Sequence, residues 1–238
     1  MSSVDFIIPT TSRNTEWTKA EDTYLYKIFF NSLAKHRPDS INHIIIGYDE
    51  DDEIFSKPEE RLKFIEFGFE MIWIPITPEP GNVVRVWNIL ANHSKAEYLM
   101  VAGDDIKFPN DKNWLRLFMK LLKKNQNIGW SAGYSNNNRI ATQFLIHRKH
   151  LEIFGFVYPP ALTNYFCDDW MYEIYPESFR NWRTDYPLLN CGGRPRYQPI
   201  NDSKLCGLLL KRYKKDLSKF TQKNKIVESK CLNQTQSE

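Results

Sequence analysis

The feature that most constrains this chain is the alternation of strand-like and helix-like patterns from its N-terminus to about residue 108. Short segments rich in apolar and β-branched residues alternate with segments whose apolar residues recur at helical spacing. Strands are expected at 4–9, 42–48, 69–76 and 98–102, and helices at 19–36, near 57–67 and at 83–93. Strands that alternate with helices form a mostly parallel sheet with right-handed crossovers and helices on both faces. The sequence therefore predicts an α/β, Rossmann-type domain.

Two of the expected helix starts carry a capping-box spacing, in which Ser or Thr precedes Glu by three residues. Thr18 with Glu21 marks the first helix, and Ser56 with Glu59 marks the second. Pro58 also suits the first turn of the second helix, because its missing N–H has no helical partner there. Both helices are expected to begin at these caps.

The pattern changes after the fourth strand. Here we expect helices at 113–124 and 170–175, strands at 129–134 and 143–148, and a closing helix in the basic part of the last thirty or so residues, which includes Lys211, Arg212, Lys214 and Lys215. A polar end rich in Asn, Gln and Ser follows it. This half is more irregular than the first.

Composition is that of an ordinary globular protein, with 42% hydrophobic and 14% aromatic residues among 238. The net charge of +3 gives no reason to expect nucleic acid as a partner. The N-terminus lacks the pattern of a signal peptide, and no apolar run approaches the roughly 20 residues that span a bilayer. We expect a cytoplasmic location and no transmembrane segment. The basic residues of the closing helix leave peripheral contact with a membrane surface open.

Cysteine and histidine give weak metal signals. The four cysteines are widely spaced and form no C-x-x-C pair, so a structural zinc site is not expected. His147 ends an expected strand, where it is a weaker candidate for a metal or diphosphate contact.

Asp104 and Asp105 directly follow the apolar strand at 98–102 and a glycine. Ligands of open parallel sheets bind at the carboxyl ends of strands, so this position has functional weight. Two adjacent acids there repel each other and lose hydration unless a cation neutralises them. Oxygen ligands suit Mg²⁺ or Mn²⁺, which also take ligands from a substrate diphosphate. The pair therefore predicts an Mn²⁺ or Mg²⁺ site, with an acidic loop facing water as the alternative.

Five segments together resemble those of the GT-A-fold glycosyltransferases, in the same order. They are VDFIIPTTSR, IIIGYDEDD, NVVRVWNIL, YLMVAGDDIKF and FCDDWMYEIY, and they lie within residues 4–175. The resemblance implies one GT-A-like domain over 1–225, with a nucleotide-sugar-binding half at 1–108 and an acceptor-binding half at 109–225. The remainder, 226–238, is expected to be a flexible tail.

The resemblance also implies roles for single residues on the donor side. Pro9, Thr10, Thr11 and Arg13 match the loop that surrounds the nucleoside. Asp49 matches the acid that accepts hydrogen bonds from the base, and Arg85 matches an arginine that approaches the nucleotide. Asp104 and Asp105 match the family's DxD motif. By register, Asp105 is expected to bind the metal directly and Asp104 to contact the ribose or support the metal.

Asp168 and Asp169 match the family's acidic catalytic motif, in which the second acid usually takes the proton from the acceptor hydroxyl. Asp169 is the first choice for the base and Asp168 the second. The bland alternative is that both acids only stabilise the start of a helix. Trp170 and Tyr165 are candidate stacking partners for an acceptor sugar.

We therefore expect a metal-dependent, inverting glycosyltransferase that moves a sugar from a nucleoside diphosphate sugar, a UDP-sugar by preference, to a carbohydrate hydroxyl. Two other readings stay open: a nucleotidyltransferase for sugar phosphates, and a module that binds nucleotide-sugars without catalysis. The first would usually carry a glycine-rich phosphate loop after its first strand, and TTSRNTEW has no glycine. A two-metal nuclease is disfavoured, because the weak net charge offers no groove for a polyanion.

Overall fold

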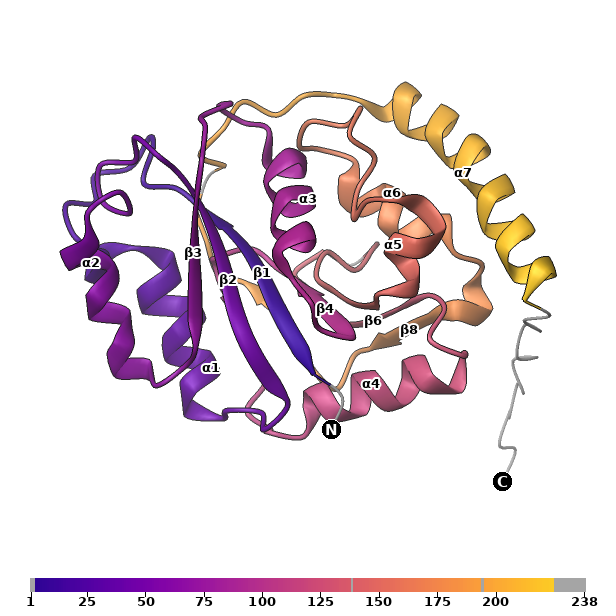
Figure 1. Cartoon of the computed structure of the whole chain (residues 1–238), viewed down its shortest axis with the longest axis horizontal. Helices are drawn as coiled ribbons and strands as arrows, with labels where there is room; N and C mark the ends of the chain where they lie inside the picture. Colours follow the sequence, from indigo (N-terminus) through magenta and orange to yellow (C-terminus); the bar gives the residue numbers. More distant parts are fainter. Residues whose placement is uncertain (1–2, 138, 194, 225–238) are drawn as a thin grey trace.

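The computed structural model describes residues 3–137, 139–193 and 195–224. Its main strands are β1 (Val4–Thr10), β2 (Ile41–Asp49), β3 (Met71–Ile76), β4 (Tyr98–Val101), β6 (Trp130–Gly133), β7 (Phe144–His147) and β8 (Arg180–Arg183). They form one seven-stranded sheet in the order β3-β2-β1-β4-β7-β6-β8 (Figure 1). The strands from β3 to β4 are parallel, whereas β7 runs antiparallel to β4 and β6. The predicted α/β fold with a mostly parallel sheet is confirmed.

The α-helices are α1 (Asn31–Lys35), α2 (Pro58–Leu62), α3 (Val83–His93), α4 (Trp114–Lys124), α5 (Lys149–Phe154), α6 (Cys167–Ile174) and α7 (Ser203–Lys223). A π-helical segment (Leu25–Phe30) precedes α1, and 3₁₀ segments occur at Ala20–Asp22, Lys63–Phe67 and Glu177–Phe179. Two short strands, β5 (Ile106–Lys107) and β9 (Leu189–Asn190), pair antiparallel as a second sheet. The helices expected at 83–93 and 113–124 are confirmed almost to the residue.

Both faces of the main sheet are covered, which explains why its central strands are apolar at successive positions. Phe6 and Ile8 of β1 belong to the apolar cluster that includes residues of α1, the 63–67 segment and α4. Ile7 between them belongs to a second cluster, which includes residues of α3, α6 and α7. Helix α3 lies very close to β2, because Gly47 leaves room for it. A Cβ atom at Gly47 would lie 2.8 Å from Val86 Cγ1. Helices therefore sit on both faces, as predicted (Figure 1).

The first helix does not begin at the expected capping box. The backbone becomes extended at Thr23, where ψ is 154°, so a separate 3₁₀ turn ends there and a new helix begins at Tyr24. Thr23 Oγ1 accepts a hydrogen bond from the Tyr26 N–H at 3.2 Å, which makes Thr23 the working cap. The Thr18 hydroxyl instead donates to Asp22 at 3.2 Å. The single helix at 19–36 is thus a wrong prediction, because the extended backbone at Thr23, five residues after Thr18, interrupts it.

The second helix and the later helices also shift slightly. Lys57, not Ser56, occupies the cap of α2, and Pro58 takes the first turn as expected. Helix α6 begins at Cys167, earlier than the expected start at Trp170. Helix α7 confirms the closing helix, and the expected tail at 226–238 lies outside the described residues.

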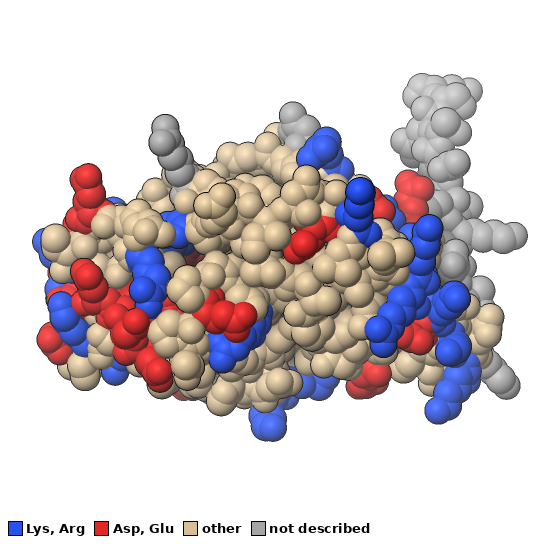
Figure 2. Space-filling view, turned by 90° about the horizontal axis from the view of Figure 1, so that it is seen from above, with Lys and Arg blue, Asp and Glu red and all other residues tan. Residues whose placement is uncertain are grey.

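Helix α7 carries most of the basic residues of the C-terminal part. Lys and Arg gather over it at the right of Figure 2. They are Lys204, Lys211, Arg212, Lys214, Lys215, Lys219 and Lys223. Leu208 on the same helix is 64% exposed. Peripheral contact with a membrane surface stays a prediction. In the part of the chain that the structure describes, no helix combines the length and apolarity needed to cross a bilayer.

Replacing the true cap should destabilise the fold more than replacing the predicted one. Thr23 is fully buried, and its hydroxyl also donates to the Ala20 carbonyl at 2.7 Å. We expect Thr23→Ala to lower the free energy of unfolding by about 1–2 kcal/mol in urea denaturation. Thr18→Ala, at an exposed site, is the matched control and should change it by less than about 0.5 kcal/mol. A larger loss in Thr18→Ala than in Thr23→Ala would contradict the assignment.

Candidate functional site

The carboxyl ends of β1, β2 and β4 meet at the upper edge of the sheet in Figure 1 and border a cavity of about 1030 Å³. The cavity lies beside the parallel part of the sheet, where this fold class binds its ligands. Of the predicted site residues, its wall includes Pro9, Thr10, Thr11, Arg13, Asp49, Asp104, Asp105, Tyr165 and Asp168. The structure thus brings the donor-side candidates other than Arg85, one catalytic candidate and one acceptor-side candidate to a single cavity.

Asp104 is the most enclosed acid of this site, with a side chain only 2% exposed. It accepts a hydrogen bond from Thr10 Oγ1 at 2.7 Å, because β1 and β4 are neighbours in the sheet. Arg196 approaches from the far end of the sequence and binds both carboxylate oxygens of Asp104, with one contact of 2.8 Å from Nη1 to Oδ2. The charge of Asp104 is therefore compensated inside the protein.

Asp105 differs from its neighbour in its electrostatic environment. Burial, and then the charge of Asp104, raise the pKa of Asp105 to about 6, against a weaker opposing effect of Arg196. A carboxylate whose charge is disfavoured in this way would be stabilised by a cation. Asp104 and Asp105 offer oxygen atoms only, as Mg²⁺ and Mn²⁺ prefer. The two side chains therefore fit the predicted metal.

These two acids would supply only part of a coordination shell. Within residues 3–137, 139–193 and 195–224, no three His, Cys, Asp or Glu side chains converge as a metal site. Divalent ions with one or two protein carboxylates take their other ligands from water and substrate phosphates. A metal here would accordingly depend on a bound diphosphate.

The loop after β1 is fixed by acids at the end of β2. The Asp52 carboxylate accepts hydrogen bonds from the Ser12 N–H at 2.6 Å and the Ser12 hydroxyl at 2.8 Å. Arg13 Nε donates to Asp49 Oδ2 at 2.7 Å, and the Arg13 guanidinium also pairs with Asp51. The predicted base-binding residues Arg13 and Asp49 are therefore partners of each other, at the edge of the cavity. Asp52 holds the loop in place, a role that the sequence analysis did not assign.

Asp168 and Asp169 both lie in the first turn of α6, but only Asp168 is among the residues that line the cavity. Burial, and then the charge of Asp169, raise the pKa of Asp168 to about 7. The turn is preceded by Phe166 in a left-handed conformation with φ of 68°, which is costly for a bulky side chain. The Phe166 carbonyl accepts a hydrogen bond from the Trp170 N–H at 3.0 Å. The strained residue thus sets where the helix starts and where its acids point.

Arg85 is not placed as predicted, because its neighbours on α3 face the cavity instead. Asn82, Val83 and Val86 are among the residues that line the cavity, whereas Arg85 is not. The Arg85 guanidinium turns to the loop before the helix, where Nη1 donates to the Thr77 carbonyl at 2.9 Å. Arg85 therefore lies outside the cavity wall, and its contact with the nucleotide stays a prediction.

His147 lies at the wrong edge of the sheet for a metal ligand. Strand β7 is antiparallel to β4, so His147 pairs with Tyr98 at the start of β4, opposite the Asp104 end. Its ring packs edge-on against Tyr98, with centroids 5.0 Å apart, and its Nε2 lies 3.5 Å from Glu97. The prediction rested only on the position of His147 at the end of a strand, and the end of an antiparallel strand lies at the opposite edge of the sheet from the Asp104 end of β4.

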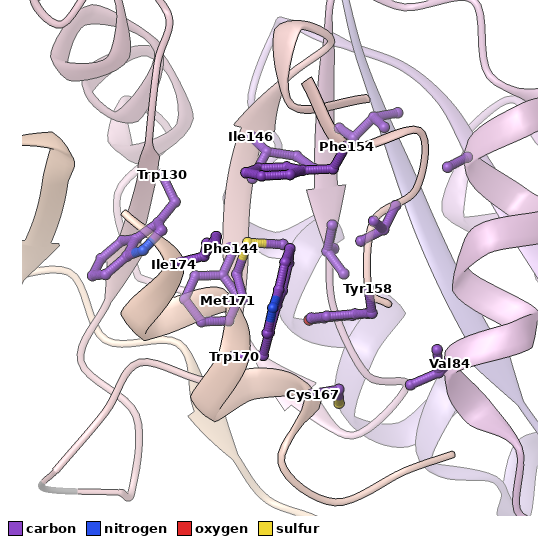
Figure 3. Packing of buried hydrophobic residues seen from close by; sticks show 14 of the residues in the cluster. Val84, Trp130, Phe144, Ile146, Phe154, Tyr158, Cys167, Trp170, Met171 and Ile174 are labelled. Atoms are coloured by element: carbon purple, nitrogen blue, oxygen red, sulfur yellow. The ribbon is translucent and has the colours of Figure 1, made fainter. Parts of the chain in front are cut away.

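Trp170 is part of the core. Its side chain is fully buried, with its ring centroid 5.4 Å from that of Phe154 and 6.0 Å from that of Tyr213. Figure 3 shows the indole among Phe154, Met171 and Tyr158. It is unavailable to an acceptor sugar, and this prediction is wrong. Tyr165, by contrast, is 41% exposed and lines the cavity.

Arg196 is the main site residue that the sequence analysis did not single out. Its local signal was the run GGRPR at 192–196, in which two glycines precede basic residues. Glycines of this kind let backbone approach a ligand or an acid closely. A Cβ atom at Gly192 would lie 2.1 Å from Asp105 Oδ2, so this approach requires glycine.

Neutralising Asp168 should stabilise the protein at high pH. Because its pKa is raised in the folded state, the stability gained from the protonated carboxyl is lost as the pH rises from about 4 through 7. We expect Asp168→Asn to raise the free energy of unfolding at pH 8 by roughly 1–3 kcal/mol, with a smaller gain at pH 5. Denaturation curves at both pH values measure this. Asp185→Asn, beside Arg183 on the surface, is the control and should give no gain. A destabilised Asp168→Asn at pH 8 would contradict the electrostatic assignment.

No protein-family profile and no curated protein sequence matches this chain. Among solved structures, it is similar to S. aureus TarS 1–349 in complex with UDP-GlcNAc, with a TM-score of 0.63 and 12% identity over 89% of this chain and 66% of that one. It is also similar to the mannosyltransferase PcManGT from Pyrobaculum calidifontis in complex with GDP-Man and Mn²⁺, with a TM-score of 0.59 and 13% identity over 82% of this chain and 58% of that one.

The chain thus spans less than two thirds of either structure's length, and the likeness is one of fold. It extends over both the parallel strands and the more irregular second half, since most of this chain is covered in each case. Together with the sheet order and the position of the cavity, these similarities give one conclusion: over most of its length, this chain has the fold of the GT-A nucleotide-sugar glycosyltransferases.

Proposed function

We propose that this protein is a metal-dependent glycosyltransferase that transfers a sugar from a nucleoside diphosphate sugar, a UDP-sugar by preference, to a carbohydrate hydroxyl. One observation carries the proposal: a single cavity holds the Asp104-Asp105 pair and the Arg13-Asp49 pair, and the raised-pKa acid Asp168 also lines it. In this proposal the Asp104-Asp105 pair serves the diphosphate through a cation, the Arg13-Asp49 pair serves the nucleobase, and Asp168 accepts the proton.

Residues of the first half of the chain are proposed to bind the donor. We expect Arg13 and Asp49 to replace part of the hydrogen bonding between them with contacts to the nucleobase, and we expect Thr11 to lie beside the ribose. Asp105, with support from Asp104, would hold an Mn²⁺ or Mg²⁺ ion. When bound, that ion supplies Lewis-acid stabilisation of the charge that develops on the leaving diphosphate. Residues 1–108 would therefore form the donor half of the domain.

The acceptor side belongs to the second half of the chain. We propose Asp168 as the base that takes the acceptor proton, in preference to Asp169, because Asp168 lines the cavity. A raised pKa makes a carboxylate a stronger base, provided that the pH is high enough to keep it ionised. A base opposite the diphosphate favours one in-line displacement with inversion. Tyr165 would contact the acceptor.

Nucleotide binding should depend on metal. We expect UDP to raise the midpoint of thermal unfolding in the presence of Mn²⁺ and to have little effect without it. GDP, TDP and CMP, tested in the same way, report base preference. Asp105→Asn should abolish the metal-dependent shift, whereas Asp185→Asn on the surface should retain it. If no nucleotide stabilises the protein in a metal-dependent manner, the proposal fails.

If Asp168 is the general base, its replacement should impair turnover and leave nucleotide binding intact. Asp168→Asn should keep the Mn²⁺-dependent shift with UDP and lower kcat by at least about 100-fold, because general-base catalysis contributes on that order. In wild type, kcat should rise with pH through about 7 as Asp168 ionises. UDP release from a UDP-sugar with a carbohydrate acceptor measures both. If Asp169→Asn is inactive while Asp168→Asn turns over normally, Asp169 is the base.

A further inference from the structure

Residues 190–193 and 195–200, which we call the strap, contribute several residues to the wall of the cavity that the two acids also line. The Cys191 N–H donates to the Asp105 carbonyl at 2.9 Å, directly after the β5-β9 pair. The Gly193 N–H donates to the Tyr24 hydroxyl at 3.0 Å. At the other end, the Ile200 N–H donates to Asn164 Oδ1 at 3.0 Å. The strap is therefore anchored on both sides of the site by a small number of hydrogen bonds.

Arg196 is the residue by which the strap reaches the acids. Its guanidinium contacts both oxygens of Asp104, and Nη1 also donates to the Thr11 carbonyl at 2.6 Å. Asp104 Oδ2 additionally accepts from Thr10. Both oxygens of Asp104 are thus engaged by groups of the protein itself. A cation that approaches Asp104 meets a carboxylate that already has a cationic partner.

The guanidinium is also held from its other side. It lies over the rings of Trp17 and Tyr24, at 5.4 and 5.6 Å from the ring centroids. Such cation–π contacts strengthen when the cation is shielded from water, and the Arg196 side chain is only 16% exposed. The position of Arg196 is therefore built into the site by aromatic and acidic partners together.

Because both are positively charged, the Arg196 guanidinium and a divalent ion are alternative partners of the Asp104 carboxylate. An arginine cannot give up its charge by deprotonation in a protein, so it can leave Asp104 only by moving. Asp104 and Asp105 together carry two negative charges when ionised, and Arg196 offsets one of them. A divalent ion that joined them without a diphosphate would leave an excess of positive charge beside the guanidinium, which repels it.

We propose that Arg196 and the divalent cation compete for Asp104, so that the cation binds tightly only when the strap has released this carboxylate. The proposal deepens the proposed function, on which it rests for the position of the cation. It makes Arg196 the residue that sets the affinity of the empty site for metal. The contact between Arg196 and Asp104 would also explain why metal binding depends on a bound diphosphate.

Titration of the full-length protein with MnCl₂ alone, by isothermal calorimetry, tests the competition without any nucleotide. If Asp104 is free for a tenth of the time or less, removing the competitor tightens apparent metal binding by about tenfold or more. We therefore expect Arg196→Met to lower the Kd for Mn²⁺ by at least about tenfold. Arg183→Met, which removes an arginine paired with Asp185 away from the cavity, is the matched control and should leave the Kd unchanged.

Two further variants separate the charge from the anchoring and cover a failure of Arg196→Met to fold. Arg196→Lys keeps the charge but loses the two-pronged contact, so it should tighten Mn²⁺ binding by a smaller factor. Tyr24→Phe keeps the ring under the guanidinium and removes the hydrogen bond to Gly193, so it should also tighten binding. Adding Asp104→Asn to Arg196→Met should abolish the gain, because the contested carboxylate is gone.

Equal Mn²⁺ affinity in wild type, Arg196→Lys and Tyr24→Phe, or weaker binding in Arg196→Met than in wild type, overturns the competition. This failure is distinct from a failure of the proposed function. The competition is read from metal binding alone, whereas the proposed function is read from nucleotide stabilisation and turnover. A protein that binds Mn²⁺ competitively but no nucleotide would retain the first and lose the second.

Discussion

Two adjacent carboxylates at the end of a buried strand are the constraint around which this site is organised. Burying a charge costs free energy unless the charge is paired. Asp104 and Asp105 each also raise the free energy needed to ionise the other. The fold compensates Asp104 with Thr10 from the neighbouring strand and with Arg196 from the strap. It leaves Asp105 with a raised pKa. The contrast between the two acids, rather than their mere presence, marks Asp105 as the carboxylate whose charge the protein compensates less.

The sheet is what allows so distant a set of residues to meet. Because β1 lies between β2 and β4 and all three run in the same direction, their polar ends share one edge. The antiparallel strand β7 then ends this run and turns the second half of the chain towards the same cavity from another side. Asp168 arrives there on α6, whose start is fixed by the strained Phe166. The residues proposed for the donor side thus lie on the parallel strands, and those proposed for the acceptor side lie on the elements that follow them.

The parts of the fold that sequence could predict are those governed by local periodicity. The parallel strands and helices α3 and α4 were predicted within a few residues, since their apolar patterns are long and regular. Predictions failed where a choice depended on a distant partner. His147 and Trp170 are chemically plausible site residues, yet one lies on an antiparallel strand and the other inside the core. Thr18 was predicted as the first helix cap, whereas the buried Thr23 caps the helix in the folded protein.

The sequence by itself determined the α/β class and the location of the site, because apolar periodicity and the polar residues after each strand are local properties. It also predicted that Asp104 and Asp105 would have a positively charged partner, since two neighbouring acids repel in any buried setting. Only the tertiary structure decided that the positively charged partner of Asp104 is Arg196. Arg196 reaches it across 92 positions of sequence, over the rings of Trp17 and Tyr24. No local pattern encodes that contact, because it exists only once the strap has closed over the folded sheet.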